Sequence, residues 1–395
     1  MLERPRSKAG WTRVCFDQMA MQVSDRVDNP AEAGVERYVG LEHLDPDSLR
    51  IRRWGEPSDV ESTKLRFQPG DIIFGKRRVY QRKVAVADFE GICSAHAMVL
   101  RARPSAVLPE FLPYFMQSNL FMERALSISV GSLSPTINWS ALAVEEFLLP
   151  PIQEQGRFVE VLAAAEAAQE SLGKLALSLQ VAQMSVLKDM TAMGTLTTLG
   201  QLVDNGLIAP PQDGNHGEKH PKASDYIDEG IPFVMASDLI DGRVDFARCK
   251  KLPKTLADGL RIGFAHEGDI LLSHKGTVGE VALLSGLKTD YAMLTPQVTY
   301  YRVLDQSRLD SEWLFYSFLS PDFQMQLRRY ERQSTRAYVG ITTQRELKIP
   351  MCPISEQRLV VDKLSATSKA KSEAGLRRRT LGELYSKILS KSFEQ

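Results

Sequence analysis

Two long helical segments of matching sequence constrain this chain more than any other feature. After Pro150 and Pro151, apolar residues recur at alternating spacings of four and three, which is the pattern of a coiled-coil seam. The positions are Val161, Ala165, Ala168, Leu172, Leu175, Leu179, Ala182 and Val186. At about 1.5 Å of rise per residue, a helix of about forty residues forms a rod of roughly 60 Å, which a compact domain would not bury end to end. The segment is therefore expected to act as a spacer.

The second helical segment indicates that the chain is a tandem duplication. PIQEQ at residues 151–155 returns as PISEQ at residues 353–357, an offset of 202. Upstream, FLPYFMQSNLF matches WLFYSFLSPDF at the same offset, and two further pairs keep the order with an offset smaller by a few residues: PGDIIFGK with EGDILLSHKG, and YVGLEHL with FVMASDL. Solenoid repeats run roughly 20 to 50 residues, so a unit of about 200 predicts two domains and two rods.

We therefore predict an α+β protein in four parts. Two strand-rich α/β domains, at residues 1–148 and 195–350, are separated by long helices at residues 149–194 and 351–395. The two helices are expected to pair as an antiparallel coiled coil. Within the domains, the local pattern predicts the following elements: a strand and turn at 38–44, a strand at 72–74 matched by one at 270–272, two strands within 84–100 joined at 88–91, and one helix over 108–127.

Gly173 and Gly375 fall at the same repeat position near the middle of the two helices. Glycine there costs about 1 kcal/mol relative to alanine, which suggests a close approach of the two backbones. We expect both glycines at or near the helix crossing; the alternative is that both are tolerated and exposed. Lys363, Thr367 and Arg377 replace apolar seam residues in the second helix, and we expect them to face solvent or a partner.

Composition excludes several classes of protein. No apolar run reaches the eighteen or so residues of a membrane span, and the N-terminal sequence lacks the apolar core of a signal peptide. The four cysteines are scattered without a CxxC pair, which favours reduced thiols in the cytoplasm. We expect no metal site, since His216 and His220 lie in a loop rich in proline and glycine.

The lysine and arginine residues form local clusters, although the chain as a whole has no net charge. Lysine and arginine number 49, equal to aspartate and glutamate, so the formal net charge is zero. Five cations nevertheless fall within residues 76–83, and Arg328, Arg329, Arg332 and Arg336 fall within nine residues. Phosphate contact depends on the charges at the surface that is touched, so both clusters are candidates for nucleic-acid contact. The alternative is an ordinary solvated face.

The order of these motifs resembles the specificity subunit of a type I restriction-modification system. The resemblance rests on the PPIxEQ-type helices together with FGKRRVYQRKVAVADFEGICSAH, ILLSHKGTVGEVALL, LTPQVTYYR and STRAYVGIT, and it covers nearly the whole chain. It implies two target recognition domains, each reading half of a split DNA sequence. It also implies that the helices dock two methyltransferase subunits, which bind S-adenosylmethionine, and that separate motor-nuclease subunits use ATP and Mg. The chain itself is expected to bind no cofactor.

The residues independently favour a non-catalytic role, and the resemblance implies that this role belongs to a multisubunit restriction endonuclease and adenine-N6 DNA methyltransferase. We find no methyl-donor loop of the F-x-G-x-G kind, no N-P-P-[FY] or D-P-P-[FY] tetrapeptide and no Walker A sequence. Two other hypotheses stay open: a specificity subunit serving a fused methyltransferase-nuclease or a phage-exclusion system, and a scaffold that binds protein instead of DNA.

The DNA-contact candidates are polar residues at matching loop positions of the two halves, because arginine and lysine read guanine while hydroxyl groups mostly hold phosphates. For any one of them, simple solvation or a hydrogen bond within the fold is an equal alternative. The candidates are Lys76, Arg77, Arg78, Tyr80, Arg82, Lys83, Ser134, Thr136 and Asn138 in the first half, and His274, Lys275, Thr277, Ser334, Thr335, Arg336 and Tyr338 in the second.

Overall fold

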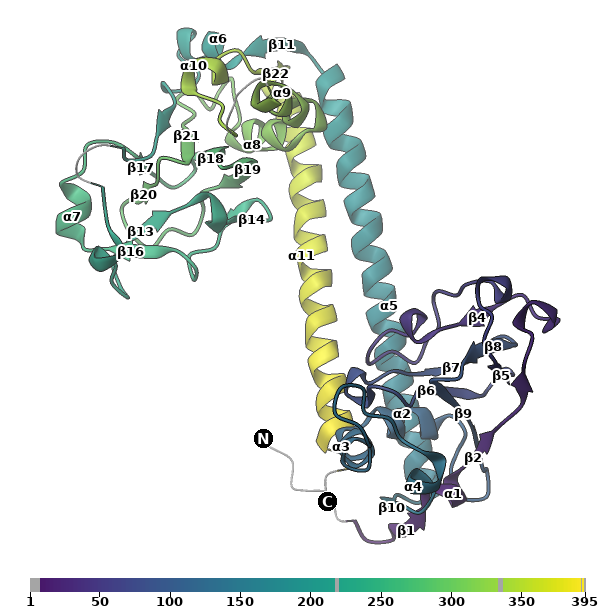
Figure 1. Cartoon of the computed structure of the whole chain (residues 1–395). Helices are drawn as coiled ribbons and strands as arrows, with labels where there is room; N and C mark the ends of the chain where they lie inside the picture. The colour runs from purple at the N-terminus through teal and green to yellow at the C-terminus, as the bar shows by residue number, and fades with distance from the viewer. Residues whose placement is uncertain (1–7, 217–219, 333–336, 392, 394–395) are drawn as a thin grey trace. The chain divides into compact units, whose positions relative to one another are not determined.

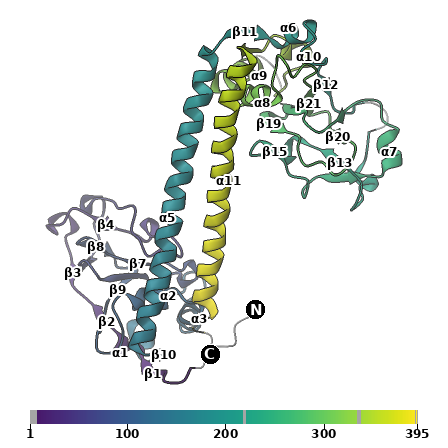
Figure 2. The ribbon, with the colours of Figure 1, turned by 180° about the vertical axis from the view of Figure 1, so that it is seen from behind.

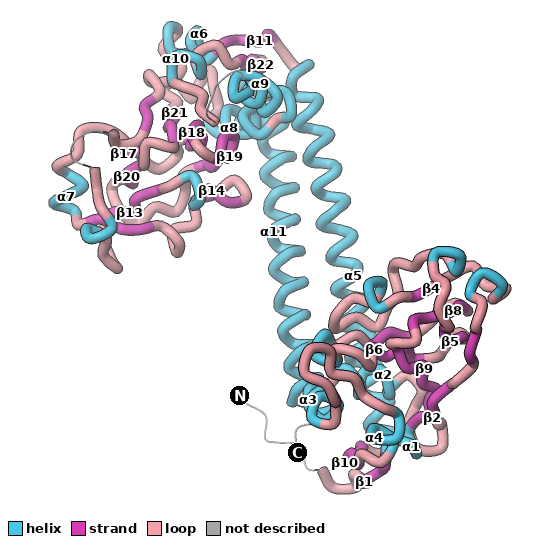
Figure 3. The backbone as a smooth tube through the Cα atoms, in the orientation of Figure 1, coloured by secondary structure: helices cyan, strands magenta, loops and turns pink. Residues whose placement is uncertain are grey.

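The computed structural model describes residues 8–216, 220–332, 337–391 and 393. It divides into two compact units, Met1–Gly173 with Gly375–Gln395, and Lys174–Ala374. Each unit takes half of the long helix α5 (Ile152–Asp189) and half of the long helix α11 (Ile354–Lys391), both of 38 residues. The α+β class and the tandem plan predicted from the sequence are confirmed (Figure 3).

The first unit contains two four-stranded sheets and one strand pair (Figure 1). In hydrogen-bonded order, the first sheet is β2 (Ala20–Val23), β9 (Ala97–Ala102), β6 (Ile72–Gly75) and β7 (Val84–Val86), and the second is β3 (Arg26–Val27), β5 (Lys64–Phe67), β8 (Gly91–Ser94) and β4 (Tyr38–Val39). β1 (Thr12–Cys15) pairs antiparallel with β10 (Glu146–Leu149). The helices are α1 (Phe16–Met19), α2 (Phe111–Gln117), α3 (Asn119–Ser127) and α4 (Trp139–Ala143).

The second unit repeats this plan. One sheet is β12 (Gln212–Asp213), β21 (Val298–Tyr301), β18 (Ile270–Lys275) and β19 (Thr277–Leu283), and the other is β16 (Lys250–Leu252), β13 (Ile231–Val234), β20 (Ala292–Leu294) and β17 (Phe264–Ala265). Two pairs accompany them, β11 (Thr195–Thr198) with β22 (Lys348–Met351) and β14 (Leu239–Ile240) with β15 (Arg243–Val244). The helices are α6 (Leu199–Asp204), α7 (Lys254–Asp258), α8 (Ser311–Leu319), α9 (Pro321–Arg332) and α10 (Ile341–Gln344).

Strand direction supports the duplication in detail. β4 runs parallel to β8 in the first unit, as β13 runs parallel to β20 in the second, while β5 and β17 are antiparallel to β8 and β20. The two units differ at the sheet edges: β3 extends the sheet beyond β5, whereas β16 extends the other sheet beyond β13. The duplicated core is therefore the same three strands, decorated on opposite edges.

Three local predictions need correction. Residues 84–100 hold parts of three strands instead of two, because the chain turns again at Ala95 and His96 and β8 joins a different sheet from β7 and β9. The single helix predicted over 108–127 is two helices, since Ser118 is extended and its hydroxyl accepts a hydrogen bond from Phe121 N as an N-cap. The SHK tripeptide at 273–275 continues strand β18 instead of forming a loop.

The helix pair is antiparallel within each unit. In the first unit, the Tyr385 hydroxyl lies 3.1 Å from a Glu166 carboxylate oxygen. In the second unit, Gln183 Nε2 donates to Ser368 Oγ at 2.8 Å. Within the first unit, Glu166, Gln169 and Gly173 lie near Tyr385, Gly382 and Arg378 respectively, so the α11 residue number falls as the α5 residue number rises. Figure 2 shows the second half of α5 beside the first half of α11.

The coiled-coil seam predicted on α5 is correct at five of its eight positions. Val161, Leu175 and Ala182 are exposed, and the residue after each one turns inward instead. The remaining five predicted positions are partly buried: Ala165, Ala168, Leu172, Leu179 and Val186. The true seam includes Gln169 and Gln183, and a search for apolar spacing passes over such polar positions. Of the replaced positions in α11, Lys363 and Arg377 are exposed while Thr367 is half-buried.

The central glycines are not explained by close backbone approach. A Cβ added at Gly173 would lie 3.6 Å from Arg378 Cζ, at the end of a flexible side chain. A Cβ added at Gly375 would meet no described atom within 4 Å. Alanine therefore fits sterically at Gly375 and would press only on a movable guanidinium at Gly173. That the two glycines mark the crossing stays a prediction.

The repeated PIxEQ motif has a structural explanation in its glutamine. Gln155 is buried, donates to Pro150 O at 2.9 Å and accepts from Leu108 N at 2.9 Å. Gln357 is also buried, donates to Cys352 O and Arg308 O at 2.8 and 3.0 Å, and accepts from Asp310 N at 3.0 Å. Gln155 thus ties the first turn of α5 to the loop before α2. Gln357 ties the first turn of α11 to the loop before α8.

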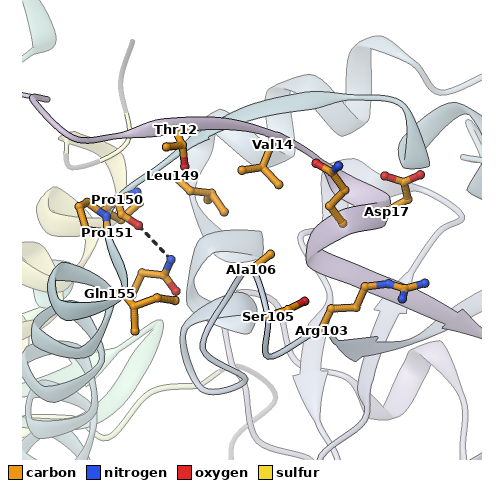
Figure 4. A pocket seen from close by; sticks show the side chains of 12 residues that line it. Thr12, Val14, Asp17, Arg103, Ser105, Ala106, Leu149, Pro150, Pro151 and Gln155 are labelled. Carbon is orange, nitrogen blue, oxygen red and sulfur yellow. Dashed lines mark hydrogen bonds between the residues drawn. The ribbon is translucent and has the colours of Figure 1, made fainter.

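Figure 4 shows Gln155 at the edge of a surface pocket of about 670 Å³ in the first unit. β1, β10, the start of α5 and the segment at 103–106 line this pocket, and its charged residues are Asp17 and Arg103. Arg103 Nε donates to Ala20 O at 3.4 Å, which ties that side chain to the fold. The pocket therefore lies at the join between domain and helix.

We expect Gln357→Leu to lower the free energy of unfolding of the second unit by about 2–3 kcal/mol, because three backbone groups lose their hydrogen-bond partner. Urea denaturation measures this change. Gln180→Leu is the matched control on an exposed helix position and is expected to stay within about 0.5 kcal/mol of the unchanged protein. Equal effects of the two variants would show that the buried amide does not tie the helix to its unit.

Candidate nucleic-acid interface

Two loops of the first unit are joined by backbone hydrogen bonds at the end of the central strand β6. Ile137 N donates to Lys76 O at 3.0 Å, and Arg78 N donates to Pro135 O at 2.7 Å. Arg77 and Thr136 form an antiparallel bridge between these two bonds. We call residues 76–78 with 135–137 the first clasp. It brings together the two loops of the first half that the sequence proposed as DNA contacts.

The second unit has the same clasp. Val339 N donates to His274 O at 2.9 Å, Gly276 N donates to Ala337 O at 3.0 Å, and Lys275 bridges Tyr338. Residues 274–276 with 337–339 form this second clasp. Each bond matches one of the first clasp at offsets of 198 for the first loop and 202 for the second loop. The duplication therefore preserves the clasp bond by bond, although most of its side chains differ.

One clasp position has a left-handed backbone in both units but an arginine in one and a glycine in the other. Arg78 has φ 58° and ψ 54°, the left-handed conformation, and its counterpart Gly276 also has a positive φ of 80°. Glycine adopts this conformation without steric cost, whereas a residue with a Cβ loses roughly 1–2 kcal/mol. Non-glycine residues held in this region cluster at functional sites. The arginine therefore gives up stability that glycine would retain, which points to a role for its exposed side chain.

The first clasp lies in a field of positive charge. Arg77 Nη1 lies 3.2 Å from His96 Nε2. Burial lowers the pKa of His96 from its usual value, and Arg77, Lys76 and Lys64 lower it further. Burial also lowers the pKa of the Lys76 ammonium. A neutral His96 can accept a hydrogen bond from Arg77, so the histidine aims the guanidinium without opposing its charge.

The loop of the first clasp also carries an ordered tip. Val130 and Thr136 exchange two backbone hydrogen bonds of 3.0 Å, which close the segment 131–135. Arg78 Nε donates to Ser134 Oγ at 3.3 Å and holds the tip against the basic loop. Arg78 is therefore braced at its backbone by Pro135 and at its side chain by Ser134.

Exposed polar and cationic residues occur at the second clasp and on helix α9 of the same unit. Lys275 and Thr277 are exposed at the β18–β19 turn, and Tyr338 is 43% exposed. Arg328, Arg329 and Arg332 lie on the exposed face of α9, which packs against β19. A clasp with hydroxyl and cationic groups around it can hold phosphates and donate to base edges.

Comparison with known proteins assigns this architecture. Residues 59–179 match the type I restriction modification DNA specificity domain. The chain is 30% identical over 166 residues to the type I restriction enzyme EcoDI specificity subunit of Escherichia coli, a match that covers 40% of this chain and 35% of that protein. A Methanocaldococcus jannaschii protein named as the MjaX specificity subunit is 21% identical over 390 residues, covering 88% of this chain and 82% of the relative. These matches show that the chain is similar to type I restriction-modification specificity subunits.

Solved structures share the fold. The S subunit of a type I system from M. genitalium has a TM-score of 0.64 at 13% identity and covers 100% of this chain and 98% of its own. A second solved chain has a TM-score of 0.55 at 20% identity, with 98% of both chains covered. Its description concerns complex assembly and conformational transition of the type I R-M system. At these identities the likeness concerns the tandem fold.

In the first unit, the structure separates the candidates into surface and structural residues. Arg78, Tyr80 and Asn138 are exposed, while Lys76, Arg77, Ser134 and Thr136 are half-buried within the clasp. Arg82 and Lys83 are committed to the fold: Arg82 Nε donates to Asp47 at 2.6 Å, and Lys83 Nζ donates to Leu41 O at 2.6 Å. Their charge predicted phosphate contact, but their geometry indicates a bracing role.

The second unit requires a similar correction. His274 is only 1% exposed, and its ring nitrogens lie 3.3 Å from Val339 O and 3.2 Å from Pro296 O. It supports the second clasp from inside instead of presenting a group to a ligand. Lys275, Thr277 and Tyr338 remain surface candidates. Ser334, Thr335 and Arg336 lie outside the described residues.

Sequence reasoning missed His96. His96 lies in the turn between β8 and β9, far in sequence from its partner Arg77, so only pairing of the strands could reveal it. His216 and His220, excluded as ligands from sequence, lie in a loop on either side of residues outside the described part, and the described residues hold no cluster able to bind a metal.

Proposed function

We propose that this chain is the DNA-reading subunit of a type I restriction-modification complex, with each recognition domain reading one half of a bipartite duplex target. The observation that carries the proposal is the pair of clasps, identical in backbone bonding and different in side chains. A shared backbone frame sets the position of two loops, and different side chains on it suit two different half-sites. The target can then be asymmetric within a single polypeptide.

We further propose that the long helices dock two methyltransferase subunits. Support comes from large apolar residues that stay exposed on them, which is unusual for helices that have only solvent as a neighbour. On α5 these residues are Ile152, Val161, Leu175, Leu177, Val181 and Met184; on α11 they are Leu359, Leu376 and Leu384. Their side chains give a partner apolar surface to cover.

The chemistry is assigned to the partners in this proposal. S-adenosylmethionine would be bound by the methyltransferase subunits, and ATP and Mg by motor-nuclease subunits. This chain would supply sequence recognition and a docking surface, acting inside the cell wherever the host DNA is. Among the described residues, no helix has the length and apolarity needed to cross a membrane.

Methylome sequencing of the host tests the proposal. Cells with the intact gene are expected to carry N6-methyladenine in a motif of two specific segments separated by a fixed unspecific spacer, and deletion of the gene is expected to remove that motif alone. Restoring the gene should restore it. Persistence of every methylated motif after deletion would contradict the proposal, and a salt-insensitive protein partner would then favour the scaffold hypothesis.

A further inference from the structure

Leu133 at the tip of the first clasp loop is the most exposed large apolar side chain among the described residues, at 91%. Val130, three residues earlier, is 75% exposed. Single exposed apolar residues are common on protein surfaces, but two such residues on one short loop beside a basic cluster are a local concentration. Because the fold does not bury these two side chains, contact with a ligand would explain why they are apolar.

The tip is held in a fixed position. Paired hydrogen bonds between Val130 and Thr136 close it, Gly131 has a φ of 113°, and Arg78 anchors it through Ser134 and Pro135. A loop that was merely flexible would not need this bracing. Leu133 is thus presented to solvent next to the arginine that adopts the left-handed conformation.

The charged side chains near Leu133 indicate which type of ligand it contacts. Arg77, Arg78 and Lys76 supply positive charge on the same clasp. A surface that combines cations with one projecting apolar side chain matches the major groove edge of a thymine, whose C5-methyl group lies between phosphate backbones. Thymine alone among the four bases presents an apolar group there.

We propose that Leu133 contacts the methyl group of a thymine in the half-site read by the first domain. The inference rests on the proposed DNA-reading function and adds a specificity-determining residue to it. The second half has Thr335 at the position matching Leu133, and Arg332 at the position matching Val130. The leucine itself therefore occurs in the first half alone.

The test compares thymine with deoxyuridine, which lacks only the methyl group. The complex is purified from host cells through a tag on this chain, and its binding is measured on duplexes that carry the motif found by methylome sequencing. Each thymine is replaced by deoxyuridine in turn. The unchanged protein is expected to lose about 3- to 5-fold in affinity at one thymine of one half-site, the effect of one buried methyl group.

Three variants identify the residue responsible. Leu133→Ala is expected to bind the thymine duplex about 3- to 5-fold more weakly and to show no further loss on deoxyuridine. Leu133→Met, which keeps volume and apolarity, is expected to retain the sensitivity to the methyl group. Leu126→Ala removes another exposed leucine, on α3 outside the clasp, and should behave as the unchanged protein.

The outcomes separate this inference from the function on which it rests. If the unchanged complex methylates a bipartite motif but Leu133→Ala keeps the same deoxyuridine sensitivity, the inference is overturned and the proposed function stands. If Leu133→Ala no longer copurifies with its partner subunits, the leucine is a protein contact and the inference is also overturned. If the unchanged protein has no bipartite motif, both fail together.

Discussion

Arg302→Met is expected to lower the free energy of unfolding of the second unit by about 3–5 kcal/mol, the largest stability effect that we predict for one residue. Arg302 Nε and Nη2 donate to the two carboxylate oxygens of Asp269 at 2.8 and 2.7 Å. Asp269 is only 1% exposed and keeps one other donor, His266 N at 2.7 Å. Removing the arginine therefore leaves a buried carboxylate without its counter-charge.

The duplication supplies a second copy of this pair. Asp71 in the first unit is equally buried and accepts from Arg101 Nε and Nη2 at 2.7 and 2.9 Å, with Gln68 N as the additional donor. Asp71 and Asp269 are the aspartates of the PGD and EGD repeats. Arg101→Met is thus expected to destabilise the first unit and leave the second unchanged.

Hydrogen exchange of β18 and β21 measures the effect of Arg302→Met within its own unit, because a protein of several domains need not unfold in one step. Arg248→Met is the matched control at an exposed position of the same unit. Asp269→Asn added to Arg302→Met should recover part of the loss, since an uncharged amide is cheaper to bury. A loss no larger than that of the control would show that the buried pair does not hold the sheet together.

Arg77→Ala combined with Arg78→Ala is expected to weaken duplex binding by about 10- to 100-fold and to lower the salt slope by about two, one for each charge removed. Both residues belong to the first clasp, and Arg78 is exposed there. A titration of affinity against salt concentration measures both changes. Unchanged binding across that titration would remove the first clasp from the DNA footprint.

Arg78→Gly separates binding from folding. Because Arg78 is left-handed, glycine should keep or raise stability by up to about 1 kcal/mol while the guanidinium is lost. Affinity is expected to fall about 10-fold, with one unit less of salt slope. Arg13→Ala removes an exposed arginine of the same unit outside the clasp and should leave affinity unchanged. Equal affinity of Arg78→Gly and the unchanged protein would indicate that the strained arginine has no role in binding.

The duplication could be recognised in the sequence because the repeated residues have structural roles that few other residues could fill. Gln155 and Gln357 bond backbone groups, and Asp71 and Asp269 are buried carboxylates that accept from a backbone N–H and an arginine, so the same residues recur at a near-constant offset. The helices, the two domains and the order of matched strands follow from these repeats. Repeated residues thus predicted architecture well.

Positions that depend on pairing between distant segments were not readable. The coiled-coil seam passes through Gln169 and Gln183, whose polarity hides their inward orientation from an apolar search. Charge alone placed Arg82 and Lys83 among the DNA contacts, although each is bonded within the fold. His274 was predicted at a surface loop position, whereas the structure buries it in the paired strand β18. The exposed Leu133 carried no polar signal at all.

Methylomes of two variant strains test most directly the claim that one chain carries two independent readers. One strain carries Arg77→Ala with Arg78→Ala in the first clasp, and the other carries Lys275→Ala with Tyr338→Ala in the second. The account predicts that each strain relaxes or loses specificity in one half of the methylated motif, a different half in each strain, while the spacer stays the same length. Changes to the same half in both strains, or to both halves in either one, would contradict it.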